Sequence, residues 1–130
     1  MSSEHSIFDI AAEAAIHARE ENVDRAQVSN LLSALEGLRA QFANDQDVLR
    51  ALQVFIARQA RVSKREIGIR TASALIQGLS KCSNVEEARR FLGLFKWMYE
   101  SLERIPIRVR QGRGYERYNR ILQEYLLRRR

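Results

Sequence analysis

The sequence predicts an all-α protein: a compact bundle of four to six helices followed by a basic C-terminal arm and helix. Apolar residues recur at spacings of three and four along most of the chain, which is the period of an amphipathic helix. A single proline and six glycines among 130 residues argue against a turn-rich β-sandwich. A chain of this length can bury one core, and its single cysteine excludes a disulfide framework.

Two long helices are expected first, over 25–43 and 45–61. Asp24 reads as the N-cap of the first helix, with Gln27 as its partner three residues on, and Asp45 can cap the second. Their inward stripes are predicted to be Val28, Leu31, Leu32, Leu35, Leu38 and Phe42, then Val48, Leu49, Leu52, Phe55, Ile56 and Ala60.

Capping boxes predict two further helices. Ser63 to Glu66 opens one, which Gly78 is expected to end, and Ser83 to Glu86 opens the other. The predicted inward residues are Ile67, Ala72, Leu75, Ile76 and Leu79, then Ala88, Phe91, Leu92, Phe95, Met98 and Leu102. Because the connections are short, consecutive helices should be antiparallel.

The two ends of the chain are expected to differ from this bundle. Residues 6–21 form an Ala-rich amphipathic helix with Ser6 as cap, which we expect to pack weakly. Pro106 ends the last bundle helix, and an extended arm with a possible brief strand leads to a final helix over about 115–127. We therefore divide the chain into a helical bundle, 1–103, and a basic arm plus terminal helix, 104–130.

The net charge of +6 is distributed unevenly. Residues 1–24 sum to −5, residues 25–103 to +4 and residues 104–130 to +7, and 19 of the 22 basic residues are arginine. Arginine binds phosphate and stacks on bases better than lysine does. An acidic head and a basic tail suggest a polyanionic partner, or copies of the chain that meet head to tail.

Catalysis finds little support in the sequence. His5 and His17 have no Cys or carboxylate at metal-ligand spacing, and Cys82, beside a predicted helix start, is either a reactive thiol or an ordinary loop thiol. We expect no enzyme, no metal site and no cofactor. The acidic N-terminus lacks the basic region of a signal peptide, and no apolar run could span a membrane, so a cytoplasmic location is expected.

Two basic clusters are the candidate nucleic-acid-binding residues. The first lies across the junction of two helices and comprises Arg58, Arg61, Lys64, Arg65 and Arg70. Alternatively, these residues form a solvated corner of the bundle and bind no nucleic acid. The second lies in the arm and comprises Arg108, Arg110, Arg113 and Tyr115, continued by Arg117, Tyr118 and Arg120. Guanidinium groups interleaved with aromatic rings are typical of single-stranded nucleic-acid binding, but these tyrosines could instead pack on the bundle.

One aromatic residue is a candidate for protein contact. Trp97 lies off the apolar stripe that contains Phe91 and Phe95, so it is expected to face outward and to mark an interface.

The order of these features resembles the small subunit of type III CRISPR effector complexes, the Csm-type helical protein. A capped helix with a Q-x-x-x-L-L pattern, Gln27 to Leu32, precedes a helix that ends in basic residues, and the aromatic helix FLGLFKWMYESL, Phe91 to Leu102, follows. The resemblance covers about residues 24–103. The arginine that the family carries early in its first helix is absent after Val28, and residues 104–130 exceed the usual pattern.

The resemblance implies a non-catalytic bundle of five or six helices. Its copies would stack head to tail beside the backbone and large subunits, and its basic surface would follow the guide RNA–target RNA duplex by phosphate contacts. By this resemblance, the residues expected to contact the RNA phosphates are Arg58, Arg61, Lys64, Arg65 and Arg70. Two alternatives remain open: a free-standing DNA-binding or regulatory protein, and a protein–protein adaptor whose arginines contact acidic partners.

Overall fold

The computed structural model describes residues 6–62 and 67–128, and most of these residues are helical. The helices are α1 (Ile7–Glu20), α2 (Arg25–Gln41), α3 (Asp45–Arg61), α4 (Ile69–Ser80), α5 (Val85–Ser101) and α6 (Gly114–Arg128). No strand occurs in the described part of the chain, so the all-α prediction is confirmed. The brief strand considered for the arm is not formed within these ranges.

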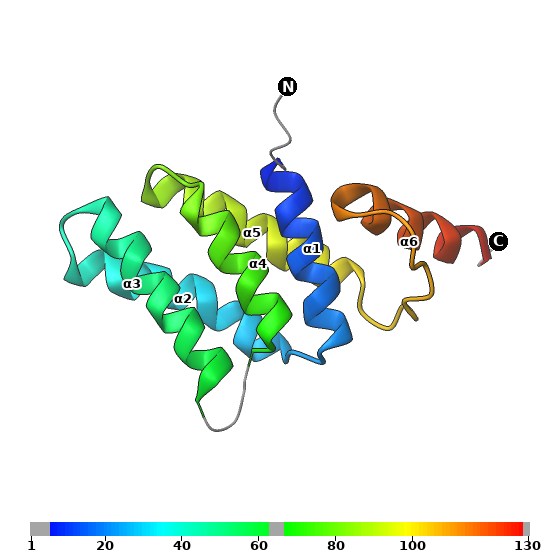
Figure 1. The fold of residues 1–130 in the computed structure, drawn as a ribbon, viewed down its shortest axis with the longest axis horizontal. Coiled ribbons are helices and arrows are strands. Elements are labelled where there is room, and N and C mark those ends of the chain that lie inside the picture. The colour runs from blue at the N-terminus through cyan, green and yellow to red at the C-terminus, as the bar shows by residue number, and fades with distance from the viewer. Residues whose placement is uncertain (1–5, 63–66, 129–130) are drawn as a thin grey trace.

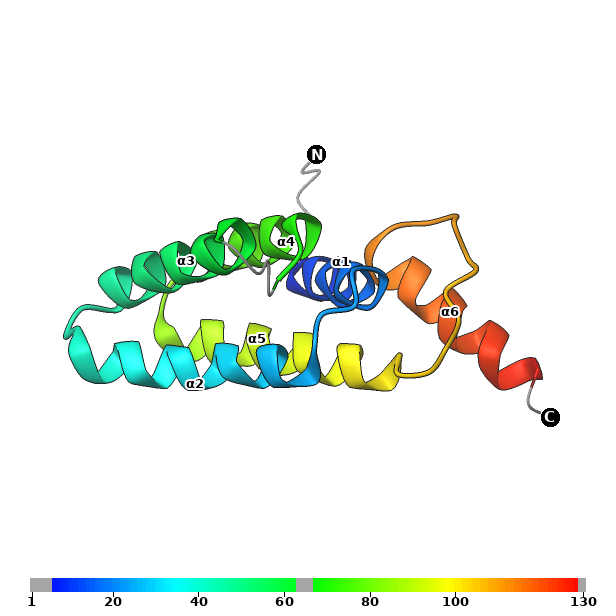
Figure 2. The same cartoon turned by 90° about the horizontal axis from the view of Figure 1, so that it is seen from below.

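The helices are arranged in two layers, with α6 to one side (Figures 1 and 2). Figure 2 shows α1, α4 and α3 in one layer above α2 and α5 in the other. Helix α1 packs against α4, α5 and α6 and therefore lies at the centre of the molecule. The core lies between the layers, where the apolar stripes of the helices meet.

The expectation that residues 6–21 pack weakly is wrong. Seven residues of α1 are buried, five of them alanine, and Ile16 is completely inaccessible to solvent. Alanine side chains allow neighbouring helices to approach closely, so a helix with few large apolar residues can still be enclosed on several sides. Ser6 is the N-cap, as expected, and its Oγ accepts a hydrogen bond from the backbone N–H of Asp9 at 3.1 Å.

The predicted core is largely confirmed. The inward stripes of α3 and α5 are buried at the predicted positions except for Phe55, which is half-buried, and Phe42 at the end of α2 is 37% exposed. Tyr99 is a buried residue that the stripe did not include. Its hydroxyl donates to the carbonyl oxygen of Val23 at 2.5 Å, and the Arg19 guanidinium lies 5.2 Å from its ring centre. These contacts account for a buried tyrosine in an apolar core.

The N-caps differ from the predictions by small shifts. Asp24 stands at the N-cap of α2 but makes no capping hydrogen bond through its side chain. Asn44, not Asp45, caps α3, and its side chain accepts hydrogen bonds from the backbone of residues 46 and 47. Asp45 instead accepts a hydrogen bond from the backbone N–H of Val85, at the start of α5, at 2.9 Å.

The cap of α5 also lies one residue later than expected. Asn84 accepts a hydrogen bond from the backbone N–H of Glu87 at 2.8 Å, and the Glu87 carboxylate accepts one from the backbone N–H of Ser83 at 2.6 Å. This is close to a capping box, with Asn84 as an equally good cap, but the Glu87 carboxylate binds the N–H of Ser83, the residue before the cap, and not that of Asn84.

Gly78 does not end α4, which continues to Ser80. A Cβ atom at position 78 would lie 2.1 Å from the tip of the Phe91 ring, so this glycine permits close packing between α4 and α5. The capping box predicted at Ser63 to Glu66 lies outside the described residues. Within them, α4 begins at Ile69 after Gly68.

The connection between α5 and α6, residues 102–113, is irregular. Ile105, Ile107 and Val109 are half-buried against the core. Arg108 and Arg110, which precede and follow Val109, are exposed. The alternation of apolar and basic residues thus divides this segment into an inner and an outer side. Helix α6 follows close to its expected bounds, with Tyr118 and Ile121 buried.

Candidate functional site

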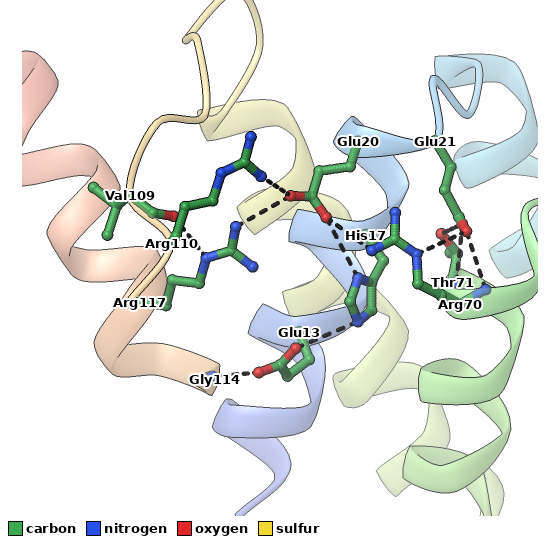
Figure 3. A network of polar contacts seen from close by, with 10 residues as sticks. All are labelled: Glu13, His17, Glu20, Glu21, Arg70, Thr71, Val109, Arg110, Gly114 and Arg117. Carbon is green, nitrogen blue, oxygen red and sulfur yellow. Dashed lines mark hydrogen bonds and ion pairs between the residues drawn. The ribbon is translucent and has the colours of Figure 1, made fainter. Parts of the chain in front are cut away.

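The carboxylate of Glu20, on the last turn of α1, contacts three arginines from distant parts of the chain (Figure 3). Its oxygens lie 3.4 Å from Nη1 of Arg70, 3.5 Å from Nη1 of Arg110 and 3.1 Å from Nη2 of Arg117. Arg117 also donates through Nε to the carbonyl oxygen of Val109 at 2.9 Å. Glu20 therefore joins the start of α4, the α5–α6 connection and α6 in one network.

The neighbouring carboxylate, Glu21, caps α4 from another part of the chain. It accepts hydrogen bonds from the backbone N–H groups of Arg70, at 3.1 Å, and Thr71, at 3.0 Å, and from the Thr71 hydroxyl at 2.5 Å. Burial alone would raise the pKa of the Glu21 carboxyl, but the hydrogen bonds from Thr71 and Arg70 outweigh burial and lower it. A Cβ at Gly68 would lie 2.1 Å from this carboxylate, so the glycine makes room for the cap.

Two further carboxylates of α1 hold the start of α6. Glu13 accepts a hydrogen bond from the backbone N–H of Gly114 at 2.6 Å, and Asp9 accepts one from that of Tyr115 at 3.0 Å. Gly114 has a φ of +57°, and a Cβ there would lie 2.8 Å from an Asp9 oxygen. Glycine therefore fits both the left-handed backbone and the close approach.

The acidic head and the basic tail thus meet within one chain. Glu20 pairs with Arg110 and Arg117 of the tail, while Asp9 and Glu13 accept hydrogen bonds from the start of α6. Negative charge at a helix N-terminus is stabilising, so these residues favour docking of α6. The charge asymmetry of the sequence therefore has a function inside the folded chain.

A cleft of about 760 Å³ lies beside this network, between α1, α4 and the start of α6. Its lining includes His17, whose Nε2 is 3.4 Å from Glu13 and whose Nδ1 is 3.6 Å from Glu20. Glu13 lies four residues before His17 and Glu20 three residues after it, and side chains at these spacings are neighbours on a helix. Our sequence analysis missed this spacing. Among the described residues, no group of His, Cys, Asp and Glu is placed to hold a metal ion.

The first basic cluster is only partly available to a ligand. Arg58 and Arg61, near the end of α3, are exposed, and neither forms an ion pair with another described residue. Arg70 is exposed but engaged with Glu20 and Glu21. Lys64 and Arg65 lie outside the described residues.

The second basic cluster divides in a similar way. Arg108 and Arg113 are exposed, without an ion pair to another described residue, and Tyr115 is 42% exposed. Arg110 is also exposed but reaches Glu20. The connection follows α1 in the antiparallel direction, from the contact of Arg110 with Glu20 to that of Tyr115 with Asp9.

The residues that continue the cluster have other roles. The Arg117 side chain is 12% exposed and faces the Glu20 network, and Arg120 pairs with Glu116 on its own helix. Tyr118 is buried, with its hydroxyl 2.7 Å from that of Ser101. For Tyr118 the packing role, left open by the sequence, is the observed one.

Aromatic side chains remain exposed in two places. Trp97 on α5 is 73% exposed, as expected from its position off the stripe, and its role in protein contact stays a prediction. Phe8 is 55% exposed and meets Tyr115 edge to face, with ring centres 5.9 Å apart. Sequence reasoning missed Phe8, although its place outside the stripe of Ile7 and Ile10 was a usable signal.

Cys82 is buried, between the end of α4 and the start of α5. Its thiol lies 3.4 Å from the carbonyl oxygen of Gly78, and burial together with the charge of Glu87 raises its pKa to about 11. A thiol with so high a pKa contains little of the nucleophilic thiolate at neutral pH.

No described helix combines the length and apolar character that a membrane span requires. No protein-family model matches the chain, and no curated protein or solved structure matches it either.

Proposed function

We propose that this protein is a non-catalytic RNA-binding subunit of a ribonucleoprotein, in the manner of the small subunit of a type III CRISPR effector. One observation carries the proposal: Arg70 of the first basic cluster and Arg110 of the second contact the same carboxylate, Glu20. Two segments that are forty residues apart in sequence therefore contribute to one edge of the molecule.

The exposed arginines of both clusters extend this edge. Figure 1 shows the end of α3, the start of α4, the end of α1 and the α5–α6 connection along the lower side of the molecule. Arg58 and Arg61 lie at the end of α3, and Arg108 lies in the connection. Exposed guanidinium groups along one edge are suited to contact the phosphates of an RNA duplex. In such a duplex the guide RNA recognises the target sequence by base pairing, so the protein needs to contact only the backbone.

Salt dependence tests this proposal directly. Affinity for a blunt guide–target RNA duplex should fall with salt, and each phosphate contact removed should reduce the slope of log affinity against log salt by roughly 0.9, the coefficient of a B-form double helix. The variant R58Q/R61Q should therefore lower both affinity and slope, and R108Q should do so independently.

A matched control is available on α3 and α5. Arg50 and Arg90 are exposed, but each pairs with a carboxylate of its own helix, at 3.5 Å and 3.7 Å respectively. The variant R50Q/R90Q removes the same charge as R58Q/R61Q and should change RNA binding less. Equal effects of the two variants would show only a general attraction, and a flat salt response would refute the phosphate contacts.

The proposal includes protein partners: the backbone and large subunits of the effector, and further copies of this chain. Trp97 is the only tryptophan of the sequence and is 73% exposed, so its fluorescence reports on any interface that covers it. A blue shift on mixing with effector subunits, or with rising concentration of the protein alone, would indicate such an interface. An adaptor protein would give the shift without any affinity for RNA.

A further inference from the structure

The junction between the start of α1 and the start of α6 exposes two aromatic rings. Phe8 is 55% and Tyr115 is 42% exposed, and their rings meet edge to face at 5.9 Å. Tyr118 backs Tyr115 from the buried side, with ring centres 5.7 Å apart. The exposed rings are therefore held in place by packing and by the hydrogen bond from the Tyr115 backbone to Asp9.

One exposed cation without an ion pair to another described residue lies close in the sequence to this pair, near three carboxylates that already have partners. Asp9 and Glu13 already accept hydrogen bonds from the start of α6, and Glu116 pairs with Arg120 at 3.0 Å. Arg113, two residues before Tyr115, is exposed and forms no ion pair with another described residue. Exposed rings with an arginine two residues away in the sequence, unpaired among the described residues, suit a nucleotide, whose base stacks on a ring while its phosphate contacts the cation.

We infer that Phe8 and Tyr115 form a stacking site for an unpaired RNA base, with Arg113 holding the adjacent phosphate. This inference rests on the proposed function and adds a single-stranded nucleotide to the duplex. The bases inside a duplex are already stacked and cannot use the rings, so the site distinguishes single-stranded from paired RNA.

The spacing along α1 predicts how many nucleotides the two sites span. Asp9, which holds Tyr115, and Glu20, which contacts Arg110, are eleven residues apart on one helix, or about 17 Å. A strand that stays stacked, with a rise of about 3.4 Å per nucleotide, needs roughly five nucleotides to cover this distance, and a more extended strand needs fewer. A strand that leaves the basic edge near Arg110 should therefore reach the rings with an overhang of at most about that length.

The experiment compares a blunt RNA duplex with the same duplex carrying a six-nucleotide single-stranded overhang that contains 2-aminopurine. The overhang should increase affinity roughly five- to hundredfold, the range expected for stacking of one base, and should quench the 2-aminopurine fluorescence. The variant F8A/Y115A should abolish both effects and leave affinity for the blunt duplex unchanged.

Controls separate stacking from folding and from charge. The variant F8Y/Y115F keeps both rings and should retain the effects, and W97A removes an exposed ring elsewhere and should do the same. An unchanged thermal midpoint and helical circular dichroism of F8A/Y115A would show that the fold is intact. If R113Q lowers the overhang gain while the rings are present, the phosphate contact is supported.

Failure of this inference differs from failure of the proposed function. If the blunt duplex binds with the expected salt dependence but the overhang adds nothing, or adds the same affinity to F8A/Y115A, the stacking site is overturned alone. If the blunt duplex does not bind, the proposed function itself fails. If F8A/Y115A abolishes binding to an effector subunit and leaves RNA binding unchanged, the rings are a protein contact and the inference is overturned.

Discussion

The carboxylate of Glu21 caps a helix that begins almost fifty residues later, through the backbone N–H and the hydroxyl of Thr71. Carboxylates from elsewhere in the chain also reach the first residues of α5 and α6. These contacts bind the helices to one another at their ends, in addition to the packing of their apolar faces.

Replacing Glu21 with Gln should destabilise the protein by about 1 to 2 kcal/mol at neutral pH, because the negative charge at the start of α4 is lost. Urea unfolding followed by circular dichroism measures this change. Glu116→Gln is the control, since that side chain is 64% exposed and pairs only on its own helix, and its effect should stay below about 0.5 kcal/mol. Equal effects of the two substitutions would contradict the capping role.

The Glu21 contribution should also depend on pH. Its pKa is lowered in the folded state, so the folded protein binds this proton more weakly than the unfolded chain does. The stabilisation is therefore complete above the ordinary pKa of 4.5 and is lost as the pH falls through the lower pKa of the folded state. The difference in unfolding free energy between wild type and Glu21→Gln should shrink below about pH 4.5; a difference that grows on acidification would contradict this.

Gly78→Ala should destabilise the protein by about 1 to 3 kcal/mol, because the new methyl group would overlap the Phe91 ring. Gly93→Ala is the matched control: it lies within α5, and a Cβ there meets nothing within 4 Å. That substitution should stabilise the protein by up to about 1 kcal/mol through helix propensity. Thermal denaturation of both variants tests the prediction, and a neutral Gly78→Ala would show that α4 and α5 can separate at little cost.

Arg117→Gln should loosen α6 locally. Its guanidinium is largely buried and bridges Glu20 to the carbonyl oxygen of Val109, so its loss leaves two polar groups without this donor. Hydrogen exchange of the α6 amides should accelerate in proportion to a local destabilisation of about 1 to 3 kcal/mol. Arg120→Gln, three residues on, should have a much smaller effect because Arg120 pairs on the helix surface.

Cys82 should react slowly with an aromatic disulfide reagent in the folded protein. A rise of its pKa from 9.0 to about 11 lowers the thiolate fraction at pH 8 by about a hundredfold, and burial restricts access further. Reaction should become rapid and stoichiometric in urea. Rapid reaction of the native protein would indicate that the connection between α4 and α5 opens readily.

Much of the fold could be predicted because its signals are local. The inward stripe of α5 needs only the spacing of Phe91, Phe95 and Met98, and the cap at Ser6 needs only its neighbours. The enclosure of α1 could not be predicted, because alanines such as Ala11 and Ala15 carry little hydrophobic signal themselves and are buried by the approach of other helices.

The candidate site was predictable only in part, because composition is a local signal whereas ion pairing is not. The arginines of the two basic clusters stand out by composition, but which of them remain exposed and unpaired depends on carboxylates far away in the sequence. The helical character of the chain, the approximate bounds of its helices and its basic tail follow from the sequence, since periodicity and caps act over a few residues. The meeting of Arg70, Arg110 and Arg117 at Glu20, and of Phe8 with Tyr115, follows from how the helices pack. These contacts join residues 50 to 107 positions apart, and they exist only because packing of α1 at the centre brings both ends of the chain together.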